Sequence, residues 1–281
     1  MQVREALKLA AKKFKESSTP SLDARLLLAH ALNYTQEKLL INYDKELEQD
    51  IETRFFEFVA RREEQEPIAY ILGRQEFYGL EFAVNKHVLI PRPETELIID
   101  ILKEDSARKD QNETIDILEL GIGSGAVSVC LAKEILTANI TAAEVSDQAI
   151  EIAQSNISKH KVQNQVKILK SDWYSGLDKG EKYDYIVSNP PYICRSEIYQ
   201  MSKETIDFEP DLALYADNEG LSSYQAIIQN AKNFLKNDGK LVFEIGYSQK
   251  NVILDLLKHA GFENTMVKQD LSGLDRIIIA N

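Results

Sequence analysis

Apolar residues recur every three or four positions through the first 75 residues, and this region has almost no strand-like alternation. One helical face is formed by Val3, Leu7, Ala10, Ala11 and Phe14. A second helix is expected to begin at Pro20, because proline is well tolerated in a first helical turn. A third helix carries Ile51, Phe55, Phe58 and Val59 on one face. The spacing therefore predicts a small N-terminal helical bundle.

The pattern changes between Pro67 and Pro93, where apolar and polar residues alternate on both sides of Gly79. Alternation around a glycine is typical of a β-hairpin, and we expect this hairpin to link two domains. A helix should then open at Glu94 or Thr95. We place the helical domain at residues 1–75, which we expect to recognise the substrate, the hairpin linker at 76–92 and a catalytic domain at 93–281.

Beyond residue 112 the chain alternates short apolar runs with segments of helical spacing, which predicts a mainly parallel sheet. The runs expected to form strands span residues 115–120, 140–145, 166–170, 183–188 and 241–245. Residues 263–281 offer two more strands joined by a Ser-Gly turn. A terminal hairpin on a parallel sheet is typical of S-adenosylmethionine (SAM)-dependent methyltransferases. We therefore predict an α/β fold with a Rossmann-like, mostly parallel sheet and one antiparallel strand.

The balance of charged residues indicates which class of partner the chain binds. The net charge is −12, and the acidic excess lies beyond residue 75, where 21 Lys and Arg residues stand against 32 Asp and Glu residues. Proteins that contact many nucleic-acid phosphates usually carry the opposite sign. The balance therefore favours a protein or small-molecule partner, and we expect no direct binding of nucleic acid.

The composition also indicates the cellular compartment in which the protein is expected. No apolar run approaches the roughly 20 residues that span a bilayer, and the first residues lack the apolar stretch of a signal peptide. Cys130 and Cys194 form no CxxC or Cys/His cluster, which indicates neither a disulfide framework nor a zinc site. We expect a cytoplasmic monomer without a membrane segment or a metal.

A glycine-rich loop follows the first strand of the predicted sheet and precedes a helix. Gly121, Gly123 and Gly125 enclose Ile122 and Ser124, and the loop is preceded by Glu119. Glycine permits positive φ and close approach of the backbone to a ligand. Because the spacing is GxGxG, and not the GxGxxG that binds a pyrophosphate, the loop suits a cofactor without phosphates.

Acidic and aromatic residues end the next two strands. Glu144 lies 23 residues beyond Gly121, a spacing at which a carboxylate can accept hydrogen bonds from ribose hydroxyls. The alternative is a solvated surface acid. After the third strand come Asp172 and Trp173, which could hydrogen-bond and cover an adenine ring. Alternatively, Trp173 packs a loop onto the core.

The fourth strand runs directly into Asn189-Pro190-Pro191-Tyr192. Pro190 removes a backbone donor and holds Asn189 in an extended conformation, so the asparagine amide should project from the carboxyl end of a strand. Open α/β sheets bind their ligands at this edge. An isolated Asn-Pro-Pro would instead be explained as a turn, and only its combination with the loop and the two acids indicates a methyltransferase site.

The chain closely resembles the release factor glutamine methyltransferase family over nearly its whole length. The stretches that carry the resemblance are GRQEFYGLEF, LIPRPETE, ELGIGSGAV, SDWYS, VSNPPYI and DFEPDLAL. The resemblance implies methylation of the side-chain nitrogen of glutamine in the Gly-Gly-Gln motif of class 1 peptide chain release factors. It implies SAM as cofactor and S-adenosylhomocysteine as product.

The resemblance also assigns roles to individual positions. It implies that residues 121–125 and Glu144 bind the cofactor, with Glu119, Asp172, Trp173 and Asn189 beside it. It further implies that the substrate amide is held by Asn189, Pro190, Pro191 and Tyr192, with Arg92 and Glu209 contributed by the RPETE and FEP segments.

Two other readings share these motifs. An N-methyltransferase acting on the exocyclic amines of nucleic-acid bases would use the same Asn-Pro-Pro-Tyr motif, but it would need a basic groove and aromatic residues for base flipping. The acidic second part of the chain disfavours this reading. A cofactor-binding scaffold without activity is disfavoured because the loop and the full Asn-Pro-Pro-Tyr motif occur together.

Overall fold

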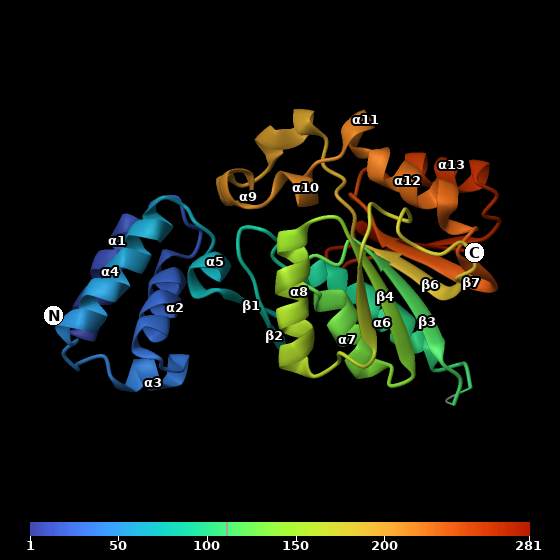
Figure 1. The fold of residues 1–281 in the computed structure, drawn as a ribbon. Coiled ribbons are helices and arrows are strands. Elements are labelled where there is room, and N and C mark those ends of the chain that lie inside the picture. The colour runs from blue at the N-terminus through green and yellow to red at the C-terminus, as the bar shows by residue number, and fades with distance from the viewer. Residues whose placement is uncertain (111) are drawn as a thin grey trace. The chain divides into compact units, whose positions relative to one another are not determined.

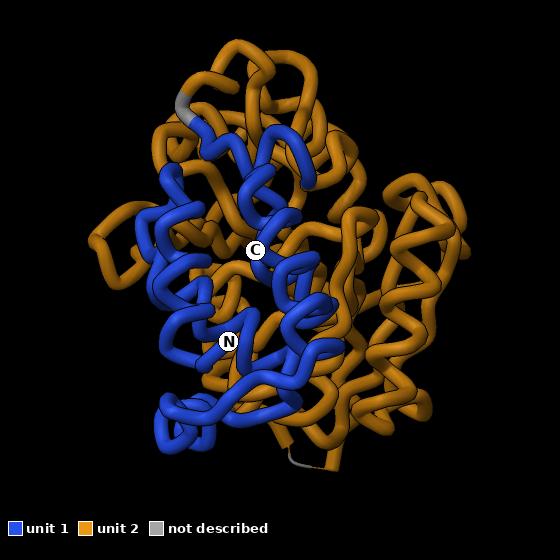
Figure 2. The backbone as a smooth tube through the Cα atoms, turned by 90° about the vertical axis from the view of Figure 1, so that its left-hand side faces the viewer, with its two compact units in different colours: residues 1–74, 201–208 blue, residues 75–200, 209–281 orange. Residues whose placement is uncertain are grey.

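The structure, a computed structural model, describes residues 1–110 and 112–281, the side chain of Gln200 excepted. The chain forms two compact units, drawn in different colours in Figure 2. One unit combines residues 1–74 with 201–208, and the other combines residues 75–200 with 209–281. The domain limits expected from the sequence, at 75/76 and 92/93, stay predictions.

The N-terminal unit is built from helices. They are α1 (Val3–Lys13), α2 (Pro20–Leu32), α3 (Gln36–Ile41), α4 (Gln49–Glu63), α5 (Ile68–Leu72) and α9 (Lys203–Phe208). The three helices expected from the spacing of apolar residues are confirmed, and Pro20 occupies the first turn of α2. Leu27, Leu28 and Phe55 lie in its fully buried core. The sequence pattern missed α3 and α5, which are too short for a helical period to be recognised.

A buried charged group connects the two segments of this unit. Nε of Arg62 on α4 lies 2.8 Å from Oδ2 of Asp23 on α2, and Nη2 of Arg62 lies 2.6 Å from Oε1 of Glu204 on α9. Asp23 also accepts hydrogen bonds from the hydroxyls of Ser17 and Thr19. The guanidinium therefore joins helices from distant parts of the chain.

The expected hairpin is present but shorter than the alternating region. Strand β1 (Arg74–Phe77) pairs with β2 (Leu80–Ala83) across a turn at Tyr78-Gly79. Both turn residues have positive φ, 51° and 73°, as a tight hairpin turn whose twist matches the strands requires. Residues 84–92 continue as irregular chain.

The larger unit contains a seven-stranded sheet in the order β5-β4-β3-β6-β7-β9-β8. Its strands are β3 (Ile115–Leu120), β4 (Ala138–Glu144), β5 (Val166–Lys170), β6 (Tyr183–Ser188), β7 (Leu235–Glu244), β8 (Thr265–Gln269) and β9 (Asp275–Ala280). Strand β9 runs antiparallel to both of its neighbours, whereas the other pairs are parallel. The predicted sheet with one antiparallel strand is confirmed.

Helices cover both faces of the sheet (Figure 1). The helical elements of this unit are η1 (Pro93–Thr95), α6 (Glu96–Ser106), α7 (Ala126–Glu134), α8 (Asp147–His160), η2 (Arg195–Gln200), α10 (Asp211–Leu214), α11 (Asp217–Gly220), α12 (Ser222–Ala231) and α13 (Lys250–His259). Ile117 packs with α6, α7 and α8 on one face, and Leu118 packs with α12 and α13 on the other. Within residues 1–110 and 112–281, no helix is long and apolar enough to cross a membrane.

Candidate active site

A cavity of about 390 Å³ lies at the carboxyl ends of β3, β4, β5 and β6. From β3 the chain proceeds to β4 and β5 on one side, whereas β6 and β7 lie on the other side of β3. Open α/β sheets bind ligands at such a switch in strand order, because the loops diverge and leave a crevice. All residues that line the cavity belong to the larger unit.

The glycine loop forms one wall of the cavity. Gly121, Gly123 and Gly125 have φ of 81°, 54° and 82°, a conformation that side chains disfavour. A Cβ atom at Gly121 or Gly123 would meet nothing within 4 Å, so these glycines are required by backbone conformation and leave open space beside the loop. Four of the five loop residues predicted to bind the cofactor line the cavity, whereas Gly125 caps α7 outside it.

Asn156 on α8 holds the loop from behind. Its side-chain amide is fully buried and donates to the carbonyl of Ser124 at 2.8 Å. The same amide accepts from N of Ala83 at 2.8 Å and donates to the carbonyl of Ala83 at 3.0 Å. One asparagine therefore fixes both the glycine loop and the end of β2, directly before the segment that contributes Val88 and Leu89 to the cavity.

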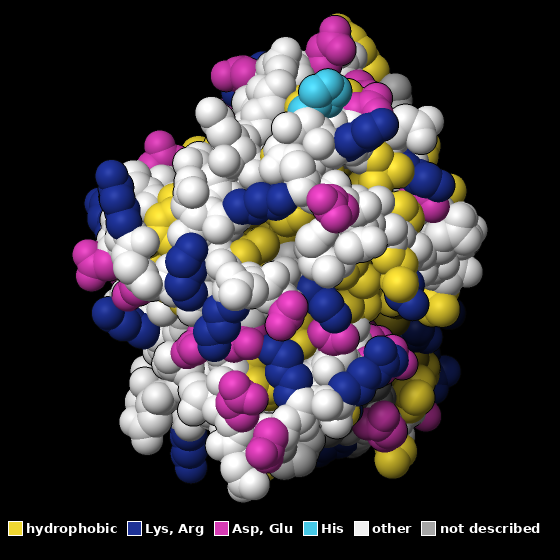
Figure 3. Space-filling model, turned by 90° about the vertical axis from the view of Figure 1, so that its right-hand side faces the viewer, with side chains coloured by type: hydrophobic (Ala, Val, Ile, Leu, Met, Phe, Trp, Pro, Cys, Tyr) yellow, Lys and Arg dark blue, Asp and Glu magenta, His cyan; other side chains and the backbone are white. Residues whose placement is uncertain are grey.

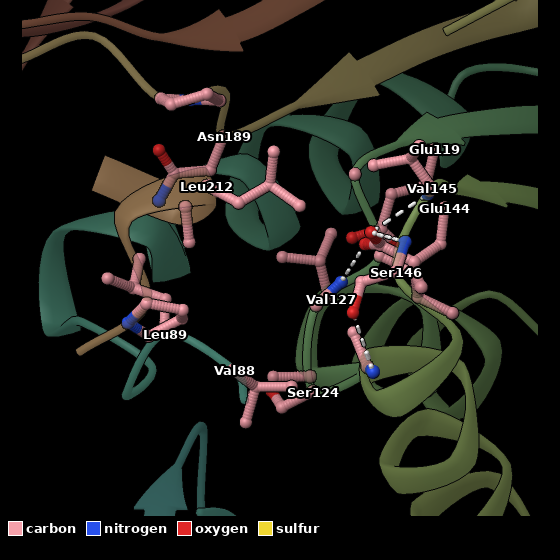
Figure 4. Close-up of a pocket in the computed structure, with 18 of the residues that line it drawn as sticks. Val88, Leu89, Glu119, Ser124, Val127, Glu144, Val145, Ser146, Asn189 and Leu212 are labelled. Carbon is pink, nitrogen blue, oxygen red and sulfur yellow. Dashed lines mark hydrogen bonds between the residues drawn. The ribbon is translucent and has the colours of Figure 1, made fainter. Parts of the chain in front are cut away.

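Glu144 ends β4 with its carboxylate at the cavity (Figure 4). Oε1 accepts from N of Val145 and N of Ser146, both at 2.9 Å, and Oε2 accepts from N of Gly123 at 3.1 Å. A carboxylate has about four acceptor positions. The three backbone donors leave one position on Oε2, enough for one ribose hydroxyl, while a second hydroxyl would have to share a backbone donor's position.

Glu119 lies beneath the loop and is only 3% exposed. Its Oε2 accepts a hydrogen bond from the hydroxyl of Ser128 on α7. Burial raises the pKa of Glu119 to about 8, and the nearby charge of Glu144 acts in the same direction. A cation in the cavity would stabilise the ionised form of Glu119, so the site suits a positively charged ligand.

Trp173 has the contacts that both interpretations of the sequence require. It lines the cavity together with Asp172, and it also packs against the apolar cluster formed with α12 and α13. Its φ of 46° is unusual for an aromatic residue. The hydroxyl of Ser171 holds this backbone by donating to the carbonyl of Trp173 at 2.7 Å.

Asn189 lies across the cavity from Glu144, beside Leu212 (Figure 4). Its Nδ2 donates to Oγ1 of Thr95 at 2.9 Å, and that hydroxyl donates to Oε2 of Glu244 at 2.6 Å. Oε1 of Glu244 accepts from the hydroxyl of Tyr192 at 3.2 Å. Glu244 is the last residue of β7 and is 1% exposed. Four side chains thus form one hydrogen-bonded chain that leads from the cavity, which Asn189 and Thr95 line, to Glu244 and Tyr192.

The Asn-Pro-Pro-Tyr turn is attached to the sheet at both ends. The hydroxyl of Ser188 donates to the carbonyl of Leu120 at 2.7 Å, and Nε2 of Gln249 donates to the carbonyl of Tyr192 at 3.0 Å. Asn189 and Pro191 line the cavity, whereas Pro190 and Tyr192 are not among its lining residues. Tyr192 packs against the core instead, so its predicted stacking on a substrate amide would require the ring to move.

Arg92 and Glu209, both predicted to bind substrate, contact each other. A guanidinium nitrogen of Arg92 donates to Oε1 of Glu209, and Oε2 of Glu209 accepts from N of Ile90 at 3.1 Å. Arg92 lines the cavity, but buried Glu209 does not. The pair joins the RPETE and FEP segments at the cavity rim. Their role toward substrate stays a prediction.

Thr95 and Glu244 were missed by sequence reasoning, as was Ser128, the partner of Glu119. One signal for Glu244 was available, because Glu119, Glu144 and Glu244 all stand at or beside the carboxyl end of a strand. In the part of the chain that the structure describes, no three His, Cys, Asp or Glu side chains gather as metal ligands. The expectation that no metal takes part stays a prediction.

The open space beside the glycines, the remaining acceptor on Glu144 and the buried acid Glu119 fit SAM, a cationic cofactor with a ribose and no phosphate. A cavity of about 390 Å³ also falls within the usual range for such sites, roughly 300–1,000 Å³. Here Glu144 would hold the ribose, Asp172 and Trp173 the adenine, and residues 121–124 of the loop the remainder.

Comparison with known proteins identifies related chains. A family model described as the PrmC N-terminal domain matches residues 5–73, and one described as the methyltransferase small domain matches residues 93–207. A bifunctional methyltransferase of Rickettsia conorii is 40% identical over 283 residues, covering 93% of this chain and 54% of that protein. The chain thus spans about half the length of these bifunctional relatives.

Solved structures support the fold alone. The human Mettl16 catalytic domain, solved in complex with a 3'UTR hairpin, matches with a TM-score of 0.59 at 14% identity, covering 82% of this chain and 81% of that chain. A methyltransferase from Pyrococcus furiosus matches with a TM-score of 0.53 at 21% identity, covering 79% and 95%. These matches agree with the predicted methyltransferase sheet.

Other relatives match from end to end. The release factor glutamine methyltransferase of Burkholderia pseudomallei is 37% identical over 271 residues, covering 95% of this chain and 94% of that protein. That of Koribacter versatilis is 36% identical over 281 residues, covering 99% and 98%. With its sheet, its glycine loop and its Asn-Pro-Pro-Tyr turn, the chain therefore belongs to the release factor glutamine methyltransferase family.

Proposed function

We propose that this chain transfers a methyl group from SAM to the side-chain amide nitrogen of the glutamine in the Gly-Gly-Gln motif of class 1 peptide chain release factors. The observation that carries the proposal is the position of Asn189. Its amide lies at the cavity, opposite the residues that suit the cofactor, and its nitrogen is committed to Thr95. The amide oxygen is the atom that remains for a substrate donor.

The chemistry requires an acceptor at this place. A glutamine amide nitrogen is a weak nucleophile, because its lone pair is delocalised into the carbonyl, as the rotational barrier of roughly 18–20 kcal/mol indicates. If Oδ1 of Asn189 and the carbonyl of Pro190 each accept one substrate N–H, they fix the direction of that lone pair and favour positive charge on nitrogen.

The bound cofactor supplies a methyl group already activated by the positive charge on sulfur. The residues of this chain then contribute orientation, since holding two reactants in line can be worth about 7–11 kcal/mol. The methylated amide nitrogen is acidic and loses its extra proton to water. No general base is assigned.

We expect the helical domain of residues 1–75 to recognise the release factor outside the methylated loop, because none of the described residues that line the cavity lies in the helical unit. A substrate of the translation apparatus places the activity in the cytoplasm. We expect the enzyme to act as a monomer.

The competing substrate class is nucleic acid, since a base amine could occupy the same position. On the face drawn in Figure 3, acidic and basic side chains are intermingled over the surface. Together with the net charge of −12, this favours a protein substrate.

The test is methyl transfer from labelled SAM by the purified protein, offered either a class 1 release factor or DNA. We expect label in the release factor and its loss when the glutamine of the Gly-Gly-Gln motif is replaced by alanine. Label in DNA, or undiminished labelling of the altered factor, would overturn the proposal.

A further inference from the structure

The hydrogen bonds that lead from Asn189 through Thr95 to Glu244 are all donated in the same direction, toward Glu244. Thr95 ends η1, Asn189 follows β6, and Glu244 ends β7, so three separate elements bring these side chains together. The distance is 2.9 Å from Nδ2 of Asn189 to Oγ1 of Thr95, and 2.6 Å from Oγ1 of Thr95 to Oε2 of Glu244. Thr95 is buried and Glu244 almost fully so.

A hydroxyl has only one proton, and an ionised carboxylate can only accept. Because Thr95 gives its proton to Glu244, its oxygen can only accept from Asn189. The asparagine must then turn its NH₂ group toward Thr95, which leaves its oxygen for the cavity. We propose that Thr95 and Glu244 are positioning residues that set the orientation of the Asn189 amide, so that an acceptor and not a donor meets the substrate nitrogen.

The hydrogen-bond geometry around Glu244 is that of a carboxylate. Burial raises its pKa and the charge of Glu94 acts in the same direction, while the hydroxyl of Thr95, the guanidinium of Arg276 and the hydroxyl of Tyr192 offset part of this rise. Two hydroxyl donors thus meet the two carboxylate oxygens, one on each. A neutral group here could donate to Thr95 and permit the reverse direction.

The consequence for catalysis is large, because a flipped amide would place N–H against N–H. The substrate would lose an acceptor and gain a repulsive contact. This inference rests on the proposed function, in which Asn189 accepts from a glutamine amide. It also assigns a role to Thr95, the threonine of the RPETE segment. The position of that segment at the cavity rim does not by itself give the threonine a role.

The test compares four variants of the full chain. Thr95→Val removes the hydroxyl at nearly constant shape, and Thr95→Ser restores it. Glu244→Gln permits donation to Thr95. The matched control is Thr141→Val, since Thr141 lies within β4 and does not line the cavity.

For methyl transfer to a release factor, we expect Thr95→Val to lower kcat by about tenfold or more, a smaller effect than loss of a transition-state donor itself. Affinity for the cofactor should stay unchanged. Glu244→Gln should lower kcat less, whereas Thr95→Ser and the Thr141→Val control should remain close to the starting protein. Equal rates for Thr95→Val and Thr141→Val would overturn the inference.

A second readout needs no turnover. The side-chain NH₂ resonances of Asn189, assigned by their absence from an Asn189→Ala spectrum, report the hydrogen bond to Thr95 directly. They should shift in Thr95→Val and Glu244→Gln but not in Thr141→Val, while thermal melting verifies that each variant is folded. Unshifted resonances in Thr95→Val would also overturn the inference. If the starting protein methylates no release factor, the proposed function fails, and the resonances still decide whether Thr95 orients the amide.

Discussion

Asp23 and Arg62 are paired in the interior of the N-terminal unit, with 2.8 Å between Oδ2 and Nε and with side chains that are 5% and 6% exposed. A pair so protected from water differs from the surface pair formed by the neighbouring Arg61 with Glu66, whose arginine side chain is 42% exposed. Removing one partner of a buried pair leaves an uncompensated charge, which costs more than the pair itself contributes.

We therefore expect Arg62→Ala to lower the free energy of unfolding of this unit by about 3–5 kcal/mol. Arg61→Ala should lower it by about 1 kcal/mol or less, because water screens the exposed pair. Urea denaturation followed by the helical signal measures both variants. Equal losses for the two would contradict the distinction between buried and exposed pairs.

Replacement of Glu144 tests the cofactor site. Glu144→Ala removes the expected ribose acceptor and the anchor of three backbone N–H groups, and SAM binding should weaken by about 1.5–3 kcal/mol. The control is Asp147→Asn, an exposed acid three positions on that pairs with Lys170. Calorimetric titration gives the dissociation constants. A constant unchanged by Glu144→Ala would contradict the assignment.

Because of Glu119, the free energy of unfolding should decrease as pH rises, which is the opposite of the usual effect of a carboxyl group. Burial raises the pKa of this carboxyl from 4.5 to about 8, so between these values the cofactor-free folded protein keeps a proton that the unfolded chain has lost. The contribution of Glu119 to stability therefore falls as pH rises through this window, by up to about 1.4 kcal/mol per pH unit.

Glu119→Gln removes this titration while keeping a hydrogen-bonding group beside Ser128. The free energy of unfolding of the variant, relative to the starting protein, should increase between pH 6 and pH 8. Glu151→Gln, at an exposed position on α8, is the control and should show no such trend. A flat difference for Glu119→Gln would mean that the buried carboxyl is already ionised near pH 6.

Asn189→Ala tests the acceptor itself. Loss of a group that acts mainly in the transition state costs about 2.7–4 kcal/mol, or 10²–10³ in rate. The prolines and the Ser188 hydroxyl still hold the turn, so the melting temperature should change little. Single-turnover transfer at saturating cofactor measures the effect. A nearly normal rate would leave the Asn-Pro-Pro-Tyr turn with a structural role only.

The local pattern of the sequence was sufficient to predict the sheet and the wall of the cavity that the glycine loop forms. Strands β3, β5 and β6 begin and end where the apolar runs do, and β3 and β6 are buried along nearly their whole length. Residues that end a strand or follow it directly, such as Glu144, Gly121 and Asn189, could be placed at the cavity because parallel strands end at a common edge.

Partners that are distant in the chain could not be found in this way. Thr95 and Glu244 are 149 residues apart, and Arg92 and Glu209 are 117 apart, so no periodicity connects them. The motif around Arg92 and Glu209 indicated a shared site but not an ion pair. Tyr192 shows the same limit, because its hydroxyl donates to Glu244, which lies 52 residues further along the chain at the end of β7.

Residues 201–208 complete the N-terminal unit, although all of residues 75–200 are made before them. During synthesis Asp23 can meet Arg62 early, but Glu204 can reach Arg62 only after strands β3 to β6 have left the ribosome. Contacts between segments so far apart in the chain form late, and surfaces that await them are exposed meanwhile. The first unit to emerge is therefore completed only after most of the second unit's sheet has been made.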